Sequence, residues 1–369
     1  MGSAAAFHLA RRGAEVVGLE TLGPAHDQGS SHGESRIIRQ AYFEDPGYVP
    51  LVLRAYQLWR ELEESSGQRL LEITGGAMIG LPDGALVSNS LESARRWDLP
   101  YRILTAGELH SEFPVFHPQS GQVGLLEPEA GVLAPERAVL AHLQLAAALG
   151  ADLHFGERVE EWEVSGAGVV VRTQLTDYRA DRLVLAAGAW SPDLLNGMAL
   201  PLKVERQVVG WFAPAQIGPF TAPSCPIYIF ERGDGALYYG VPTRDGQTAK
   251  AARHHGGEQT TAAAPRAEVS QAEISRIREG LAGMLPQLAI APMVRAQPCL
   301  YTNTPDLNFV IGNHPLSPVV SVAAGFSGHG FKFSPVVGEI LADLAASGRS
   351  ELLIRAFAPD RFADHHKGA

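Results

Sequence analysis

The beginning of the chain constrains the fold more than any other segment. Gly2 to Arg12 is an alanine-rich run with apolar residues at helical spacing, and Gly13 lies where a glycine commonly ends a helix. A short β-prone run follows and ends at Glu20, eighteen residues after Gly2. In dinucleotide-binding βαβ units a glycine opens the helix, and an acid about twenty residues further on binds the ribose. We expect the second half of such a unit here, with a first strand and two glycines upstream of Met1; an α/β protein of another kind is the alternative.

The composition predicts a compact protein with a large apolar core. The chain has 369 residues, of which 46% are hydrophobic and 19% charged, and at about 150 residues per domain this length predicts two domains. The net charge of −10 is spread along the chain, so no basic stripe is available for a nucleic acid. No apolar run reaches the roughly 18 residues of a membrane span. The two cysteines form no CxxC motif, which is typical of a cytoplasmic protein without a structural disulfide.

Periodicity predicts an α/β layer that is interrupted by a second lobe. Residues 49–66 form an amphipathic helix that Gly67 ends, and residues 135–149 form another that Gly150 ends. Between these helices, at 70–133, the pattern changes to short strands and turns. A third helix is predicted at residues 335–347, where Gly348 ends it.

The same patterns divide the chain into two discontinuous domains. We expect the dinucleotide-binding domain to consist of residues 1–69, 134–200 and 296–369, and the second domain to consist of residues 70–133 and 201–295.

Three polar clusters could carry chemistry, and the first lies in the segment 29–39. Arg36 and Arg39 flank two isoleucines there. If the segment is helical, the two arginines share a face, and guanidinium groups bind carboxylates in a bidentate manner. The cluster predicts a site for an acidic substrate; an exposed arginine pair is the alternative.

The second cluster joins Tyr238–Gly240 to Lys250 and His254. A lysine beside an apolar pocket can stabilise a developing anion, whereas a solvated loop lysine is the alternative. His255 follows His254 directly, but no other histidine, cysteine or acid stands at a ligand spacing. We therefore predict no metal site.

The third cluster joins Cys299 and residues 300–302 to the glycine-rich turn at 325–332. A lone cysteine is commonly a small buried hydrophobe. Gly325–His329 resembles the nucleophile elbow G-x-S-x-G, but it has histidine where the last glycine must be. This departure removes the best motif for a hydrolase.

Taken together, the clusters resemble the monomeric sarcosine oxidase and N-methyltryptophan oxidase family. The segments that carry the resemblance are Ser31–Arg39, Tyr239, Lys250, Cys299–Thr302 and Gly325–Lys332. Their order and separations agree over nearly the whole chain. Only the beginning departs from the family pattern, because the first strand and the first two glycines are absent.

The resemblance implies an α/β FAD enzyme, with a Rossmann-type FAD-binding domain and a second α+β substrate lobe built on an antiparallel sheet. It also implies that the flavin is attached covalently to Cys299 through a thioether. With the half motif and the glycine turns, the residues expected to bind the cofactor are Cys299, Gly2, Glu20, His32, Ser35, Arg36, Gly188, Gly328, Gly330 and Lys332.

The resemblance further implies roles around the substrate. Arg39 and Lys332 hold the substrate carboxylate, Tyr239 and His254 line the amine pocket, and Lys250 activates oxygen. The residues implied to take part in catalysis are Lys250, Arg36, His254 and Tyr239.

The resulting hypothesis is a flavoprotein oxidase that oxidises the N-methyl group of a secondary amino acid with O₂. The products would be the primary amino acid, formaldehyde and hydrogen peroxide. Sarcosine, N-methyltryptophan and other secondary or cyclic amino acids remain open as substrates. One alternative is a related FAD-dependent amino acid oxidase or dehydrogenase that uses another acceptor, and a second is a truncated chain without flavin and without activity. We expect a cytoplasmic monomer with no nucleic-acid or membrane partner.

Overall fold

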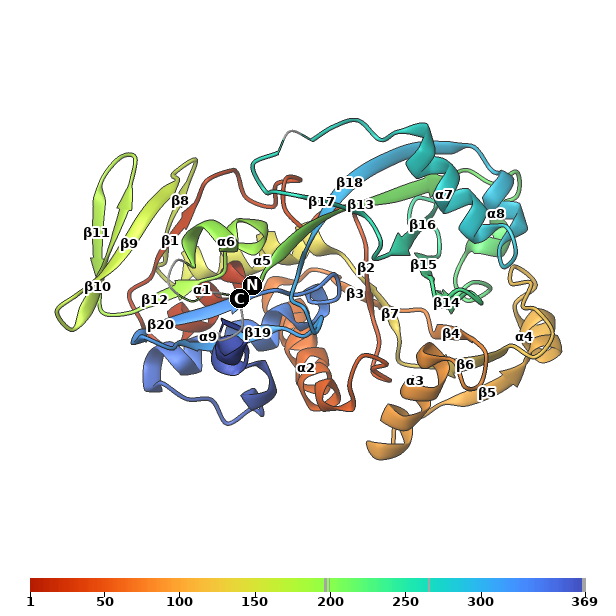
Figure 1. Cartoon of the computed structure of the whole chain (residues 1–369), viewed down its shortest axis with the longest axis horizontal. Coiled ribbons are helices and arrows are strands. Elements are labelled where there is room, and N and C mark those ends of the chain that lie inside the picture. The colour runs from red at the N-terminus through yellow and green to blue at the C-terminus, as the bar shows by residue number, and fades with distance from the viewer. Residues whose placement is uncertain (196–197, 199, 265, 367–369) are drawn as a thin grey trace.

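The protein is described from a computed structural model. It describes residues 1–195, 198, 200–264 and 266–366. Figure 1 shows a helix-rich α/β part on the left and a large sheet with peripheral helices on the right. The chain passes between these two parts several times, so each part is assembled from segments distant in the sequence.

The α/β part contains two short parallel pairings. Strand β1 (Val17–Glu20) pairs in parallel with β8 (Asp152–Phe155). Strand β12 (Leu183–Leu185) pairs in parallel with β20 (Ser317–Ala324), which also pairs in antiparallel fashion with β19 (Val310–His314). Within the part of the chain that the structure describes, no strand lies between β1 and β12, so each keeps one free edge.

Three helices cover these strands. Helix α1 (Gly2–Arg11) packs against both α5 (Pro135–Ala148) and α9 (Ser334–Ser347). The approach of α1 to α9 is close, because a Cβ atom added at Gly338 would lie 2.6 Å from Ala4. The small residues of α1 thus let three helices meet over one core.

The predicted helix at residues 49–66 is confirmed as α2 (Val49–Ser66), which packs on α9. It ends at Gly67, whose φ of +68° is a left-handed conformation that glycine adopts without steric cost. The predicted helices at the sites of α5 and α9 are confirmed as well.

The second part is built on a nine-stranded sheet that is antiparallel except for the pair β14–β4. In spatial order its strands are β17 (Glu258–Thr260), β13 (Lys203–Phe212), β16 (Ala249–His254), β15 (Leu237–Val241), β14 (Ile227–Glu231), β4 (Gly76–Gly80), β6 (Val123–Glu127) and β5 (Arg102–Thr105), with β18 (Met293–Asn303) paired to β13 off this path. The long strands β13 and β18 run together from the right side of the molecule toward the α/β part (Figure 1).

Two small sheets complete the strand content. One consists of β2 (Arg36–Ile38), β7 (Gly131–Leu133) and β3 (Leu71–Ile73), and the other of β9 (Val159–Ser165), β10 (Gly168–Thr173) and β11 (Asp177–Ala180). The helical interpretation of the first polar cluster is wrong, because Arg36 lies in a strand and Arg39 follows that strand directly. Residues three apart in extended backbone point to opposite faces, so the two arginines contact different residues.

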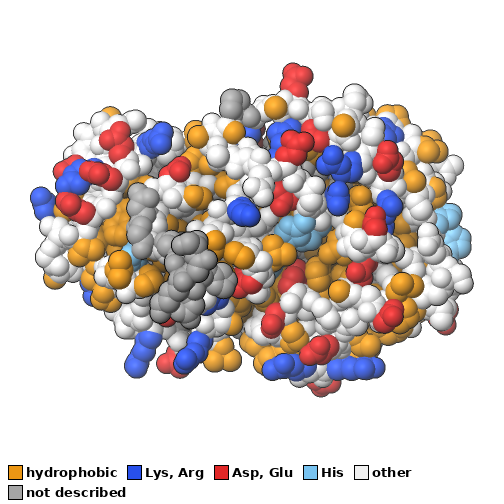
Figure 2. Space-filling model, viewed as in Figure 1, with side chains coloured by type: hydrophobic (Ala, Val, Ile, Leu, Met, Phe, Trp, Pro, Cys, Tyr) orange, Lys and Arg blue, Asp and Glu red, His pale blue; other side chains and the backbone are white. Residues whose placement is uncertain are grey.

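The expectation of only strands and turns at residues 70–133 is also wrong, because two helices lie there. The remaining α-helices are α3 (Ala85–Arg96), α4 (Ala106–Glu112), α6 (Ser191–Leu194), α7 (Gln271–Leu281) and α8 (Pro286–Ile290). The 3-10 turns are η1 (Pro46–Tyr48), η2 (Gly188–Trp190), η3 (Gly218–Phe220), η4 (Phe331–Phe333), η5 (Arg355–Phe357) and η6 (Pro359–His366). None of the described helices combines the length and the apolar character needed to cross a bilayer. Acidic and basic side chains are interspersed over the face shown in Figure 2.

Candidate active site

A cavity of about 1230 Å³ has walls from both parts of the molecule. The predicted site residues that line it are Gly2, Glu20, Ser35, Arg36, Arg39, Gly188, Tyr239, Lys250, His254, Cys299, Gly328, Gly330 and Lys332. His32 is the one predicted site residue outside this lining. Folding thus brings into one space residues that are separated by more than three hundred positions.

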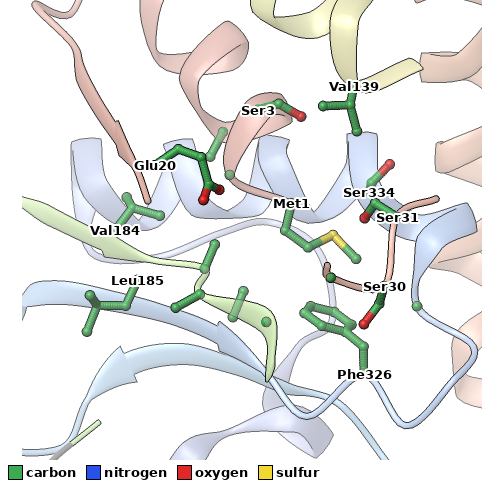
Figure 3. A pocket seen from close by; sticks show the side chains of 18 of the residues that line it. Met1, Ser3, Glu20, Ser30, Ser31, Val139, Val184, Leu185, Phe326 and Ser334 are labelled. Atoms are coloured by element: carbon green, nitrogen blue, oxygen red, sulfur yellow. The ribbon is translucent and has the colours of Figure 1, made fainter. Parts of the chain in front are cut away.

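One end of the cavity has the features of a nucleotide site. Helix α1 begins at Gly2 without a side-chain cap, so its first backbone N–H groups are free for an anion. Glu20 stands at the end of β1 and accepts a hydrogen bond from the backbone N–H of Leu22 at 3.0 Å. Figure 3 shows Glu20, Ser30 and Val184 around this space. The cavity also extends along the free edges of β1 and β12.

The carboxyl group of Glu20 is held in its ionised form. Burial raises its pKa, but hydrogen bonds from His26 and from the backbone N–H of Leu22 outweigh burial and lower the pKa below its ordinary value. An ionised acid at this position can accept hydrogen bonds from ribose hydroxyl groups.

Cys299 lies on β18 opposite Gln207 of β13 and is 4% exposed. Its sulfur accepts a hydrogen bond from Nη2 of Arg36 at 3.9 Å. The same guanidinium group donates to the carbonyl oxygens of Ser30 at 2.6 Å and Ser35 at 2.8 Å. The sulfur of Cys299 thus lies next to a cation that two backbone carbonyl groups hold in place.

Lys250 lies on β16, opposite Trp211 of β13, and is buried. Its Nζ donates to the carbonyl oxygens of Gly33 at 2.8 Å and Ser35 at 3.1 Å, and to Oγ of Ser35 at 3.2 Å. Burial lowers the pKa of this ammonium group well below its ordinary value, and the nearby Arg36 lowers it further. The solvated-loop alternative for Lys250 is wrong.

Arg39 is also buried, which excludes the exposed arginine pair of the alternative interpretation. Its Nη2 donates to Oε1 of Glu44 at 2.7 Å, and Nη1 donates to the carbonyl oxygen of Ala41 at 3.0 Å. The guanidinium carbon lies 4.1 Å from the ring centre of Tyr42 and 4.4 Å from that of Phe43. Although burial acts against the charge, Glu44 raises the pKa of Arg39, so the guanidinium group is charged.

Lys332 is a third buried cation in the cavity wall. Its Nζ donates to the carbonyl oxygen of His329 at 2.9 Å and to the hydroxyl group of Tyr42 at 3.3 Å. Burial lowers the pKa of Lys332 to about 7; Arg39 also lowers it, while Glu44 opposes both. This group therefore changes its charge near neutral pH.

Aromatic and imidazole rings close the cavity between the cations. Nδ1 of His254 lies 3.3 Å from the hydroxyl group of Tyr301, and the ring of Tyr239 meets that of His254 edge to face at 6.2 Å. Burial lowers the pKa of His254 well below its ordinary value, with a further contribution from His255. His254 is therefore neutral at pH 7, and one of its ring nitrogens can accept a hydrogen bond.

His32 lies outside the cavity lining but within electrostatic reach of Arg36 and Lys250, which line it. Both ring nitrogens of His32 are buried without a hydrogen-bond partner in the described protein, which is costly unless a further group supplies one. Burial lowers the pKa of His32 to about 4, and Arg36 contributes, so the ring is neutral with one donor and one acceptor.

The size of the cavity and the residues that line it agree with bound FAD. The cavity exceeds the roughly 300–1,000 Å³ of common ligand pockets, and it connects an uncapped helix N-terminus, an ionised acid and a cysteine next to a guanidinium group. The residues present therefore fit FAD: Gly2 and Glu20 would hold its nucleotide end, and Arg36 and Cys299 would hold the flavin, which would supply the two-electron acceptor.

Three residues with important contacts were missed in the sequence. Glu44 binds Arg39, Tyr301 contacts His254, and Glu136 binds the backbone of the loop that holds Lys250. Tyr301 belongs to a segment that carried the family resemblance. No local pattern identifies Glu136, because its partners lie about a hundred residues earlier.

Comparisons with known proteins agree with this site. A family model described as FAD dependent oxidoreductase matches residues 1–344. The monomeric sarcosine oxidase of Streptomyces avermitilis is 47% identical over 98% of this chain and 95% of its own length. The monomeric sarcosine oxidase of Bacillus sp. strain NS-129 is 36% identical over 98% and 95% of the two chains. The N-methyl-L-tryptophan oxidase of Yersinia pestis strain Pestoides F is 34% identical over 98% and 96%.

Solved structures confirm the predicted fold class. NikD, an unusual amino acid oxidase essential for nikkomycin biosynthesis, superposes with a TM-score of 0.84 at 25% identity and covers 97% of this chain and 94% of its own. L-proline dehydrogenase from P. horikoshii shares the fold with a TM-score of 0.83 at 22% identity, over 98% of this chain and 95% of its own. The predicted family is confirmed too: this chain belongs to the FAD dependent oxidoreductases.

Proposed function

We propose that this FAD-dependent enzyme is an oxidase of N-methyl amino acids, with the flavin attached to Cys299. The reaction converts an N-methyl amino acid, O₂ and water into the primary amino acid, formaldehyde and hydrogen peroxide. The single observation that carries the proposal is the cavity in which Cys299, Arg39 and Lys332 meet. Three relatives named as sarcosine or N-methyl-L-tryptophan oxidases, which are 34% to 47% identical over 98% of the chain, support the same substrate class.

The two buried cations are suited to hold the substrate carboxylate. An ammonium group has three N–H donors, and the described contacts of Lys332 use two of them. The third donor of Lys332 and the donors of Arg39 that Glu44 and Ala41 do not use can bind a carboxylate in a dry pocket, where such bonds are strong. This contact fixes the amino acid at one end, so that the position of its N-methyl group is determined.

The same cations favour the reactive form of the amine. A nearby positive charge disfavours an ammonium ion, so Arg39 and Lys332 lower the pKa of the bound substrate amine. Burial keeps the ring of His254 neutral, so one of its nitrogens can accept a hydrogen bond from this amine. Bound FAD supplies the two-electron acceptor for oxidation of the N-methyl carbon.

Lys250 is the proposed oxygen-activating residue. Reduction of O₂ by one electron forms an anion, and a fixed cation in a site without water stabilises such a charge strongly. The three acceptors around Nζ of Lys250 fix its position, and the neighbouring ring of Trp211 lies 5.2 Å from it. This arrangement supports oxidase over dehydrogenase chemistry.

Covalent attachment of the flavin is proposed on the environment of Cys299. The sulfur lines the cavity and lies next to the guanidinium group of Arg36, so it is placed to form a thioether with a flavin bound in the cavity. We also propose a cytoplasmic monomer, since both cysteines are free thiols and one chain supplies both walls of the cavity. Light scattering during gel filtration tests the monomer.

The test is a panel of N-methyl and cyclic amino acids, applied to the purified, flavin-containing protein with detection of peroxide. We expect peroxide and formaldehyde in equal amounts with at least one N-methyl amino acid. Substrate-dependent reduction of an artificial acceptor without peroxide would identify a dehydrogenase instead. Inertness toward the whole panel would overturn the proposal.

A further inference from the structure

The short loop at residues 33–35 contacts an acid on one side and a lysine on the other. Gly33 and Glu34 both have left-handed backbone, with φ values of +92° and +67°. Successive N–H groups in such turns can converge on one point and form a concave site for an anion. A left-handed conformation is unfavourable for a residue other than glycine, so the loop needs partners that hold it.

Glu136 provides the anion. Its Oε1 accepts the backbone N–H of Gly33 at 2.5 Å and that of Glu34 at 3.0 Å, and its Oε2 lies 3.2 Å from the latter nitrogen. Glu136 stands in the first turn of α5, directly after Pro135. A carboxylate in the first turn of a helix is stabilised by the helix dipole. Glu136 is thus stabilised by its place in α5 as well as by its hydrogen bonds to the loop.

The carbonyl groups of the same loop hold the lysine. Gly33 and Ser35 each present a carbonyl oxygen to Nζ of Lys250, at 2.8 Å and 3.1 Å. Glu136 is absent from the cavity lining, whereas Lys250 and Ser35 line it. The peptide groups therefore connect an acid outside the cavity to a cation in its wall.

We infer that Glu136 is a positioning residue for Lys250, because its carboxylate fixes the loop whose carbonyl oxygens hold the ammonium group in the cavity. This inference rests on the oxygen-activating role proposed above for Lys250. Glu136 contacts no reacting atom and acts only through the loop. Without its carboxylate, two backbone N–H groups lose their partner and the left-handed turn is free to relax.

The same loop also has an ion pair of its own, besides its contact with Glu136. The carboxylate of Glu34 accepts a hydrogen bond from Nη1 of Arg295 at 2.5 Å, and this guanidinium group lies 3.8 Å from the ring centre of Trp211. That contact is exposed on both sides, and exposed ion pairs contribute little. The negative charge of Glu136 also raises the pKa of Lys250, against the effect of burial.

The kinetic test compares Glu136→Ala, Glu136→Gln and the control Glu129→Gln, which removes an exposed acid with no contact to the loop. Glu136→Ala should slow reoxidation of the reduced enzyme by O₂ roughly tenfold to a hundredfold and leave anaerobic reduction by substrate unchanged. Glu136→Gln should rescue most of the rate, because one carbonyl oxygen can still accept both N–H groups. Equal slowing of both half-reactions by Glu136→Ala, or no rescue by Glu136→Gln, would overturn the inference.

Hydrogen exchange supplies a readout that is independent of turnover. In Glu136→Ala, mass spectrometry should show faster exchange of the amides of Gly33 and Glu34, with no change at distant peptides. In Glu136→Gln and in the Glu129→Gln control, exchange of these two amides should stay close to that of the original protein. Unchanged protection in Glu136→Ala would mean that the loop does not depend on the acid.

Combination with Lys250→Met separates the inference from the proposed function. If Lys250→Met slows reoxidation and Glu136→Ala adds less than about twofold to it, the two residues act through one step, as expected. If Lys250→Met slows reoxidation but Glu136→Ala has no effect on its own, only the inference fails. If Lys250→Met itself has no effect on reoxidation, the proposed role of Lys250 fails first.

Discussion

Lys332 should make carboxylate binding dependent on pH near neutrality. Burial lowers the pKa of its ammonium group to about 7; Arg39 lowers it further, and Glu44 acts in the opposite direction. A carboxylate binds most strongly when the amino group of Lys332 is charged. The affinity of the cavity for a simple carboxylate should therefore fall as the pH rises through about 7.

The magnitude follows from the protonated fraction of Lys332. If only the charged form binds, the apparent dissociation constant is nearly constant below pH 7 and increases by about tenfold for each pH unit above it, or about 1.4 kcal/mol per unit. A bound carboxylate raises the pKa of the ammonium group in the complex. The apparent dissociation constant therefore stops increasing once the pH exceeds the pKa of Lys332 in the complex.

Acetate is a suitable probe because it has no amine whose own titration would obscure that of Lys332. Its binding to the flavin-containing protein is measured from the change in flavin absorbance between about pH 6 and about pH 9. Three groups near Lys332 keep their charge over this interval. Arg39 stays charged, His329 has a pKa of about 4, and the pKa of Tyr42 is raised well above its ordinary value by burial.

Two variants of Lys332 provide the controls. Lys332→Arg keeps a positive charge at every pH used, so acetate binding should no longer depend on pH. Lys332→Met removes the charge and should bind acetate weakly at every pH. A constant affinity of the original protein across the interval would refute the reasoning, and so would an equal pH dependence in Lys332→Met.

Three other expectations concern the remaining groups. Cys299→Ala should release the flavin on acid precipitation, whereas Cys225→Ala, which changes a thiol whose pKa burial raises to about 12, should keep the yellow colour with the protein; colour retained by Cys299→Ala contradicts the thioether. Lys250→Met should slow reoxidation by O₂ far more than anaerobic reduction, and stopped-flow measurements that find equal effects would rule this out. Burial lowers the pKa of His142 from 6.5 to about 3. Below about pH 6.5 the unfolded chain therefore binds a proton at this residue while the folded chain does not, and the free energy of unfolding falls by about 2 kcal/mol by about pH 5. Urea unfolding of His142→Gln should show a smaller loss over that interval, and identical pH slopes would count against the buried neutral ring.

The helices that carry strong local patterns could be predicted from the sequence. The apolar face of α2 and the glycines that end α2 and α9 act within a few residues, and Gly67 and Gly348 have the left-handed φ values that such ends require. Helix α4 was missed, although Thr105 and Glu108 form a capping box at its start. That motif is readable in the sequence and would have corrected the expectation of strands and turns there.

The contacts of the site are less accessible to sequence reasoning, because they join distant segments. Lys250 and Gly33 are 217 positions apart, and no periodic pattern relates a lysine on one strand to carbonyl groups of a loop. The family resemblance brought these segments together before the fold was known. It did not indicate the ion pair between Glu44 and Arg39, since this pair depends on how the chain turns after β2.

The unpaired edges of β1 and β12 have a consequence for handling the protein. Backbone N–H and C=O groups along a free strand edge attract any extended peptide, including one from another molecule. These edges border the end of the cavity where Gly2 and Glu20 lie. We expect concentrated solutions of the protein to associate through these edges, while the cationic substrate end stays intact.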